Sequence, residues 1–191
     1  MDRTDFLTPP VVVRVVLALW PAGADLDPCG SPRSLVPARV RVLEPAHAAR
    51  LDVPAERLAE AGVLVADGLA LAWEPAQRVY VNPPYSRALN DAWSGKLALE
   101  GAAARARGAE VLALVRVSTG AAHFAHVWTA DALHFPSSRV AFLDGESGEP
   151  LGRPNFDVCL AYWGARVAAF VAASQELPGV TVRPVAHTER P

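Results

Sequence analysis

The sequence predicts an α/β protein with a doubly wound, mostly parallel sheet and an antiparallel last strand. One observation is the run Val111–Val117, whose nearly continuous apolar character is typical of a central strand buried on both faces. Another is a repeated pattern in which a short apolar run ends in an acidic or amide side chain, as at Asp67 and at Asn82. Ligands bind beside the carboxyl ends of strands in such sheets, so these side chains mark the expected site.

Length and composition indicate a single globular domain over residues 1–191. A chain of 191 residues is long enough for one domain with a good core and too short for two, and its 51% hydrophobic and 20% charged residues are typical of a globular protein. The formal net charge is -2, so the chain lacks the overall basic character of many nucleic-acid binding proteins. Any contact with nucleic acid must therefore depend on a local group of cations.

Cysteine usage and the chain start bear on the compartment. Cys29 and Cys159 lie far apart without a Cys-x-x-Cys motif or a histidine cluster, so we expect no zinc site, no other metal and no disulfide framework. The first residues are charged, and the apolar run 11–19 contains Arg14 and is too short to span a bilayer. We expect a cytoplasmic protein that makes no membrane contact.

The elements are expected to follow one another along the chain. Thr8-Pro9 is typical of a helix start, because the hydroxyl can cap the helix and proline lacks only an N–H that would be unpaired there. The expected strands are 24–30, 40–45, 63–69, 79–81, 111–117, 133–135, 139–143 and 156–163, and further helices are expected within 47–61, at 93–107 and at 165–173. The turn-rich loop 144–154 is a candidate mobile segment, and residues 178–191 form either another strand or a tail.

The most informative stretch is Asn82-Pro83-Pro84-Tyr85, which ends the strand 79–81. One interpretation is an ordinary strand stop, since prolines remove donors from the ladder. The other is chemical: the Asn82 side-chain oxygen and the rigid Pro83 carbonyl can accept both hydrogen atoms of a planar amine. Tyr85 then offers a ring on which a flat base can stack. Such acceptors favour a localised lone pair on an amine whose electrons are otherwise delocalised into its ring.

Acids end three earlier runs. Asp25 and Asp27 precede Pro28-Cys29-Gly30, which is either plain turn chemistry or part of a ligand loop. Glu44 follows the second expected strand, where an acid often accepts from ribose hydroxyls, although a solvated edge strand would look the same. Asp67 ends the third run, where its carboxylate could accept a hydrogen bond from the adenine amino group of a cofactor.

Several of these segments together, in this order, resemble the small phage-type DNA adenine N6-methyltransferases. The resemblance spans roughly residues 8–163 and comes from order and combination. Its members here are Thr8-Pro9, Asp25 to Cys29, Asp67-Gly68-Leu69 with Trp73, Val79 to Ser86, Trp93 with Lys96, and Arg139 to Leu143. The Gly-x-Gly loop of larger methyltransferases is absent, and the segment 27–30 takes its place.

The resemblance implies a Rossmann-like methyltransferase fold and direct transfer of a methyl group from S-adenosylmethionine to N6 of a flipped-out adenine in double-stranded DNA. It implies catalytic roles for Asn82, Pro83, Pro84 and Tyr85. The expected cofactor-binding residues are Thr8, Pro9, Asp25, Asp27, Cys29, Glu44, Asp67, Gly68 and Leu69. The expected DNA-binding residues are Ser86, Arg87, Lys96, Arg116 and Arg139.

Alternatives remain open at this stage. Cytosine N4, an RNA base and a protein glutamine all present a similar planar NH₂ group. Arg116, near the end of a buried strand, is either an ion-pair partner or a phosphate contact. A non-catalytic DNA-binding phage protein with a decayed site is the alternative outside enzymes, against which the intact Asn82 to Tyr85 argues.

Overall fold

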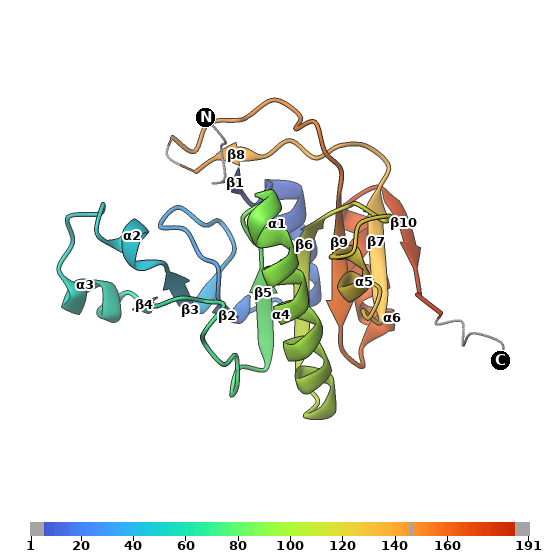
Figure 1. Ribbon diagram of the computed structural model, residues 1–191, viewed down its shortest axis with the longest axis horizontal. Coiled ribbons are helices and arrows are strands. Elements are labelled where there is room, and N and C mark those ends of the chain that lie inside the picture. Colours follow the sequence, from blue (N-terminus) through green and yellow to red (C-terminus); the bar gives the residue numbers. More distant parts are fainter. Residues whose placement is uncertain (1–5, 146, 186–191) are drawn as a thin grey trace.

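A central eight-stranded sheet forms the middle layer of the protein in a computed structural model that describes residues 6–145 and 147–185 (Figure 1). The strand order is β10-β7-β9-β6-β5-β2-β3-β4. The strands are β2 (Ala24–Asp27), β3 (Ala38–Leu43), β4 (Val63–Val65), β5 (Arg78–Val81), β6 (Glu110–Arg116), β7 (Ala132–Pro136), β9 (Val158–Trp163) and β10 (Gly179–Val182). Within the described ranges, no helix is long and apolar enough to cross a membrane.

The sheet is parallel from β4 to β6 and antiparallel beyond it. All neighbouring pairs from β4 to β6 are parallel, whereas β9 is antiparallel to both β6 and β7, and β10 is antiparallel to β7. The prediction of an α/β protein with a mostly parallel sheet is confirmed. The antiparallel part is larger than expected, because β9 lies inside the sheet and Gly179–Val182 adds an edge strand.

Helices cover both faces of this sheet. On one face α1 (Pro10–Leu19) packs with α6 (Val167–Ala173) and a 3-10 turn, η1 (Ser174–Glu176), and the other carries α4 (Arg87–Ala106) and α5 (Phe124–Val127) (Figure 1). Successive residues of a strand point to opposite faces of the sheet. Tyr80 and Leu112 therefore belong to the core under α1, and Val79 and Val111 belong to the core under α4. The continuous burial of β6 agrees with its apolar sequence.

Two smaller units flank the sheet. Next to β3 and β4, the short helices α2 (Pro45–Ala48) and α3 (Ala55–Glu60) bury Leu43 and Leu58 in a separate small core. The two-residue strands β1 (Phe6–Leu7) and β8 (Leu143–Asp144) form their own antiparallel pair. The expected strand 139–143 is therefore reduced to its end, and it pairs with the N-terminal segment rather than with the central sheet.

Two helix starts differ from the sequence-based prediction. Helix α1 has Pro9 at its N-cap and no side-chain cap, because the Thr8 hydroxyl is instead 2.9 Å from the Tyr80 hydroxyl. The expected Thr8 cap is wrong, and this residue ties the start of α1 to β5. Helix α4 begins at Arg87, where Ser86 caps it by accepting from the Leu89 amide.

A buried carboxylate joins the sheet to α1 and α6 at the amino end of β6. Glu110 is 7% exposed and accepts hydrogen bonds from the Trp20 indole (2.8 Å), the Tyr162 hydroxyl and Arg166 (2.6 Å). Burial alone would raise the pKa of this carboxyl, but the bonds from Arg166, Tyr162 and Trp20 outweigh it and lower the pKa. The charged form of Glu110 is thus stabilised in the folded state.

We expect Glu110→Ala to lower the free energy of unfolding by about 3 kcal/mol at pH 7, because it leaves two buried donors unpaired. Because the folded pKa is depressed, the native protein has this contribution above the ordinary value of 4.5 and loses it as the pH falls through the folded pKa. Urea unfolding at several pH values measures both effects. The control is Glu60→Ala, which breaks an exposed pair with Arg57 and should change stability by less than about 0.5 kcal/mol.

Candidate functional site

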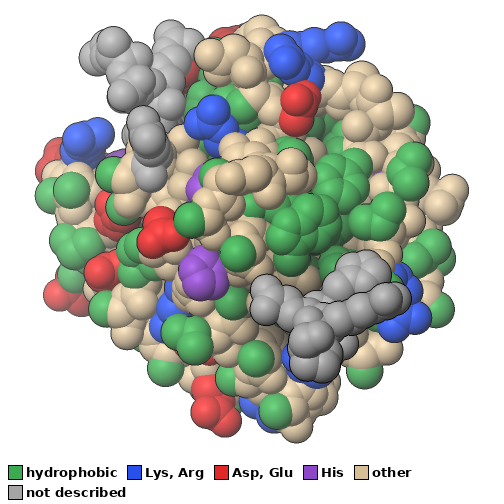
Figure 2. Space-filling view, turned by 45° about the vertical axis from the view of Figure 1, so that its right-hand side comes forward, with side chains coloured by type: hydrophobic (Ala, Val, Ile, Leu, Met, Phe, Trp, Pro, Cys, Tyr) green, Lys and Arg blue, Asp and Glu red, His purple; other side chains and the backbone are tan. Residues whose placement is uncertain are grey.

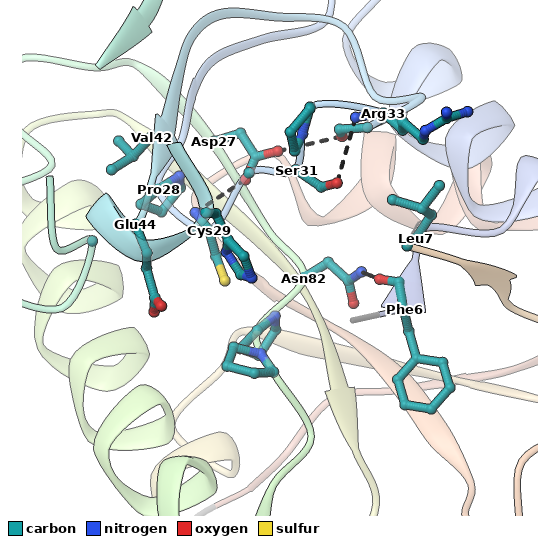
Figure 3. Close-up of a pocket in the computed structure, with 18 of the residues that line it drawn as sticks. Phe6, Leu7, Asp27, Pro28, Cys29, Ser31, Arg33, Val42, Glu44 and Asn82 are labelled. Atoms are coloured by element: carbon teal, nitrogen blue, oxygen red, sulfur yellow. Dashed lines mark hydrogen bonds between the residues drawn. The ribbon is translucent and has the colours of Figure 1, made fainter. Parts of the chain in front are cut away.

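A cavity of about 450 Å³ opens at the carboxyl ends of β2, β3 and β5. The chain leaves β2 for β3 and β4 on one side and returns to β5 and β6 on the other, so this is the point where the strand order reverses. Open α/β sheets bind ligands in the crevice at such a point. In Figure 3, Glu44 and Cys29 enter the cavity from the β3 and β2 side, with Asn82 and Phe6 across from them.

The cavity brings together most of the predicted site. Residues from distant parts of the chain line it, and those singled out from the sequence are Thr8, Asp27, Cys29, Glu44, Gly68, Asn82, Pro83 and Pro84. Pro9, Asp25, Asp67, Leu69 and Tyr85 do not line it. Most of the predicted cofactor and catalytic residues therefore share one cavity, and the others lie outside its lining.

Asp27 is the buried charge of the cavity. It is 2% exposed, and its carboxylate accepts from the Cys29 amide at 3.1 Å and from the Ser34 hydroxyl at 3.5 Å. Burial raises the pKa of Asp27 to about 6, and the Cys29 amide, the nearby Arg41 charge and Ser34 only partly oppose that shift. A carboxylate held at such cost beside a cavity is suited to a cationic ligand.

Charges of both signs surround Asp27. Glu44 ends β3 with an exposed carboxylate that accepts no hydrogen bond from the described residues, so it is available to ligand hydroxyls. Arg33 and Arg50 line the same cavity and make no side-chain ion pair within the described chain. The lining therefore suits a ligand that carries both cationic and anionic groups.

Asn82 stands at the end of β5 with both ends of its amide engaged. Its Nδ2 donates to the Phe6 carbonyl at 2.8 Å, and its Oδ1 accepts from the Tyr85 hydroxyl at 2.6 Å. An amide oxygen has two lone pairs, so one acceptor position of Oδ1 remains. The Pro83 carbonyl accepts no hydrogen bond from any described residue. The Asn82 and Pro83 oxygens are thus both available as acceptors on residues that line the cavity.

Tyr85 is buried rather than displayed. It is 6% exposed, and its hydroxyl also lies 3.1 Å from the Leu114 carbonyl. Its ring packs against Phe6, Phe142 and Phe156, with centroid distances between 5.1 and 5.9 Å. Burial raises the pKa of the Tyr85 hydroxyl well above its ordinary value, so it remains neutral. A base can stack on Tyr85 only after a neighbouring ring moves.

Two predicted cofactor acids have other partners. Asp25 lies at the amino end of β2, where it pairs with Arg78 at 2.9 Å and accepts from the amides of Gln77 and Arg78. The hydrogen bond from Arg78 keeps the pKa of Asp25 low. Asp67 caps its own turn by accepting from the Leu69 amide at 2.9 Å, and it adjoins the lining residue Gly68. Asp25 is thus structural, and Asp67 borders the cavity.

The predicted DNA-binding cations have contacts within the protein. Lys96 pairs with Glu100 at 2.9 Å, and its side chain is only 17% exposed. Arg139 pairs with Asp157 at 3.1 Å on the surface, and the Arg116 guanidinium lies 5.1 Å from the centre of the Phe156 ring without a carboxylate partner among the described residues. The Arg87 side chain is outside the described set. On the face seen in Figure 2, basic side chains are scattered rather than gathered.

Sequence reasoning missed several residues of the cavity. They are Phe6, Leu7, Ser31, Pro32, Arg33, Ser34, Val42, His47, Arg50, Leu51, Leu89 and Trp93. The polar run Ser31-Pro32-Arg33-Ser34 after a strand-ending turn was a usable signal, since loops at that edge bind ligands. Phe6 carries no local signal, because only the β1 and β8 pairing brings it to Asn82.

Residues 6–145 and 147–185 contain no group of three or more His, Cys, Asp or Glu side chains that could hold a metal ion. A comparison with models of known protein families gave no match, and a comparison with curated proteins gave no similar sequence. The function must therefore be argued from the site itself.

A first prediction concerns Asp27. Its folded pKa of about 6 lies above the ordinary 3.8, so this carboxyl makes the unliganded protein less stable as the pH rises between those values. Asp27→Asn should raise stability in urea at pH 7 and weaken binding of a cationic ligand such as S-adenosylmethionine. In the native protein that binding, measured by calorimetry, should tighten as the pH rises through about 6.

Asp25→Asn is the matched control for this change. Since the folded pKa of Asp25 is lowered, its removal should reduce stability at pH 7 and leave ligand binding intact. An Asp27→Asn protein that binds the ligand as well as the native protein, with the same pH profile, would contradict the role assigned to Asp27.

A second prediction concerns Gly68. A Cβ atom at this position would lie 1.8 Å from the Pro28 carbonyl oxygen, so Gly68→Ala must push apart two loops that border the cavity. We expect a loss of about 1–3 kcal/mol in stability, together with weaker ligand binding. Gly120→Ala is the control, because nothing lies within 4 Å of its added atom. Unchanged binding by Gly68→Ala in calorimetry would place the ligand elsewhere.

Proposed function

We propose that the protein is an S-adenosylmethionine-dependent methyltransferase that acts on N6 of a flipped-out adenine in DNA. The observation that carries the proposal is the meeting of Asp27 and Glu44 with Asn82 and Pro83 in one cavity. A mostly parallel sheet with an antiparallel portion is compatible with a Rossmann-like methyltransferase fold, but many other α/β proteins share it. The chemistry of the cavity distinguishes this protein from those.

The cofactor half of the proposal follows from charge and volume. S-adenosylmethionine carries an ammonium, a sulfonium and a carboxylate together with ribose hydroxyls. Asp27 would stabilise the cationic part, Glu44 would accept from the hydroxyls, and Arg33 or the segment before α1 would meet the carboxylate. A cavity of about 450 Å³ is in the usual range for a ligand of this kind.

The transfer half follows from the acceptors. Asn82 Oδ1 and the Pro83 carbonyl would accept hydrogen bonds from the two N–H groups of the adenine amine. These bonds would favour a lone pair on the nitrogen that is directed at the sulfonium methyl. The amine nitrogen gains the methyl group, the bond from carbon to sulfur breaks, and sulfur keeps that electron pair. The amine then loses a proton to solvent. Tyr85 holds Asn82 in place through its hydroxyl.

DNA contact in this proposal rests on few cations. Arg116 and Arg139 remain candidates for phosphate contacts. Ser86 caps helix α4, and Lys96 is mostly buried and paired with Glu100, so neither is proposed as a DNA contact. Duplex DNA must release the target base from its stack, which costs a few kcal/mol. Cytosine N4, RNA bases and protein glutamine are tested as substrates in the same assay.

The test is transfer of labelled methyl groups to plasmid DNA, tRNA and protein pools, followed by nucleoside and amino-acid analysis. The expected product is N6-methyladenine in DNA. Asn82→Ala should lower turnover by about 10²-fold or more, while S-adenosylmethionine binding stays nearly unchanged. Tyr85→Phe should keep more activity than Tyr85→Ala, because the ring remains. Labelling of another pool alone, or of none, would reject the proposed substrate.

A further inference from the structure

Three aromatic rings and one amide form a compact site beside the main cavity. Tyr85, Phe142 and Phe156 pack on one another, with Tyr85 and Phe156 centroids 5.1 Å apart and Tyr85 and Phe142 centroids 5.5 Å apart. Phe142 is fully buried, and the guanidinium of Arg116 lies over Phe156. Tyr85 and Phe142 are buried, and Phe156 is partly buried in the segment before β9.

A fourth ring, Phe6, comes from the short strand β1. Its centroid lies 5.2 Å from Phe142 and 5.9 Å from both Tyr85 and Phe156, so Phe6 touches every ring of the group. It is partly exposed, lines the main cavity and belongs to a strand of only two residues paired with β8. Phe6 and Phe156 are thus less buried than Tyr85 and Phe142, and of the four rings only Phe6 lines the main cavity.

The Phe6 backbone makes the second contact. Its carbonyl accepts from Asn82 Nδ2 at 2.8 Å, which occupies one half of the amide. Asparagine pairs with adenine through both halves, the oxygen accepting from the amine and the nitrogen donating to a ring nitrogen. The Phe6 carbonyl thus occupies the donor that such a ring nitrogen would use, while the Phe6 ring packs against Tyr85 in a tilted contact at 5.9 Å and covers part of that ring.

We propose that Phe6 is an intramolecular stand-in for the target base and that the two compete for one aromatic site. The inference rests on the proposed function, which supplies the base. Binding of adenine then requires that Phe6 leave its contacts with the three other rings and that β1 move with it. The stability of those contacts determines how strongly a base must bind in order to displace Phe6. Phe6 is a specificity-determining residue in this sense, because weakly stacking bases fail to displace it.

The competition is tested with Phe6→Ala and a fluorescent single-stranded oligonucleotide that carries one adenine among thymines. A single strand removes the cost of leaving a duplex, and S-adenosylhomocysteine in both samples fills the main cavity. Phe6→Ala should bind this oligonucleotide about tenfold more tightly than the native protein, because the competing ring is gone. Binding of an all-thymine oligonucleotide should change less.

Phe135→Ala is the matched control, since it removes a partly buried phenylalanine that belongs to none of these ring contacts. Phe6→Leu retains an apolar side chain in β1 and serves as the second variant where Phe6→Ala folds poorly; it should give an intermediate gain in affinity. In the native protein, amide exchange in β1 and β8 should accelerate when the adenine oligonucleotide binds. The proposed competition would be overturned if Phe6→Ala and the native protein bound the oligonucleotide equally well, or if neither bound it. Unchanged amide exchange in β1 and β8 on binding would overturn it as well.

The two proposals fail in different ways. If the native protein labels no nucleic acid while Phe6→Ala gains affinity for the adenine oligonucleotide, the proposed methyl transfer is wrong and the competition stands. If DNA is methylated and Phe6→Ala shows no gain, Phe6 is only a packing residue.

Discussion

The side-chain amide of Asn82 joins three parts of the chain that the fold brings together from far apart. Through Tyr85 it connects to the Leu114 carbonyl on the central strand β6, and through Phe6 it connects to the β1 and β8 pair. The two prolines after Asn82 restrict the backbone, so the amide has little freedom to turn away from these partners. A ligand that uses Asn82 Nδ2 must displace the Phe6 carbonyl, whereas Oδ1 keeps one acceptor position beside its bond with Tyr85. The donor half of the amide is therefore coupled to the position of Phe6.

The carboxyl edge of the sheet contains the groups that cost stability. Asp27 is buried with a raised pKa, and the Pro83 carbonyl has no hydrogen-bond partner in the described chain. At the opposite edge, Asp25 and Glu110 are fully paired, with Arg78 and Arg166 respectively, and their pKa values are lowered. Proteins tend to violate the rule of satisfied polar groups at functional sites. The contrast between the two edges therefore argues for ligand binding at one and structural support at the other.

Much of the fold could be predicted from local pattern. The burial of β6 follows from its continuous apolar run, and the end of β5 follows from two prolines. The place of β9 between β6 and β7 could not be predicted, because strand order depends on tertiary packing that no local signal encodes. Asp27, Glu44 and Asn82 were identifiable because each follows a strand. Phe6 was not identifiable, since only the pairing of β1 with β8 brings it to the cavity, whereas the polar run that contains Arg33 was a signal that could have been used.

The internal contacts of the predicted DNA-binding cations bear on the proposed function. Each phosphate contact releases counterions and steepens the dependence of affinity on salt. Lys96 and Arg139 are already paired and Arg116 lies over a ring, so on the proposed function these three cations would make few such contacts. A larger share of the binding free energy would then come from the flipped base itself, through stacking and the Asn82 amide. A site that depended on the base in this way would gain from the competitor that we propose in Phe6, because without one any exposed base could enter.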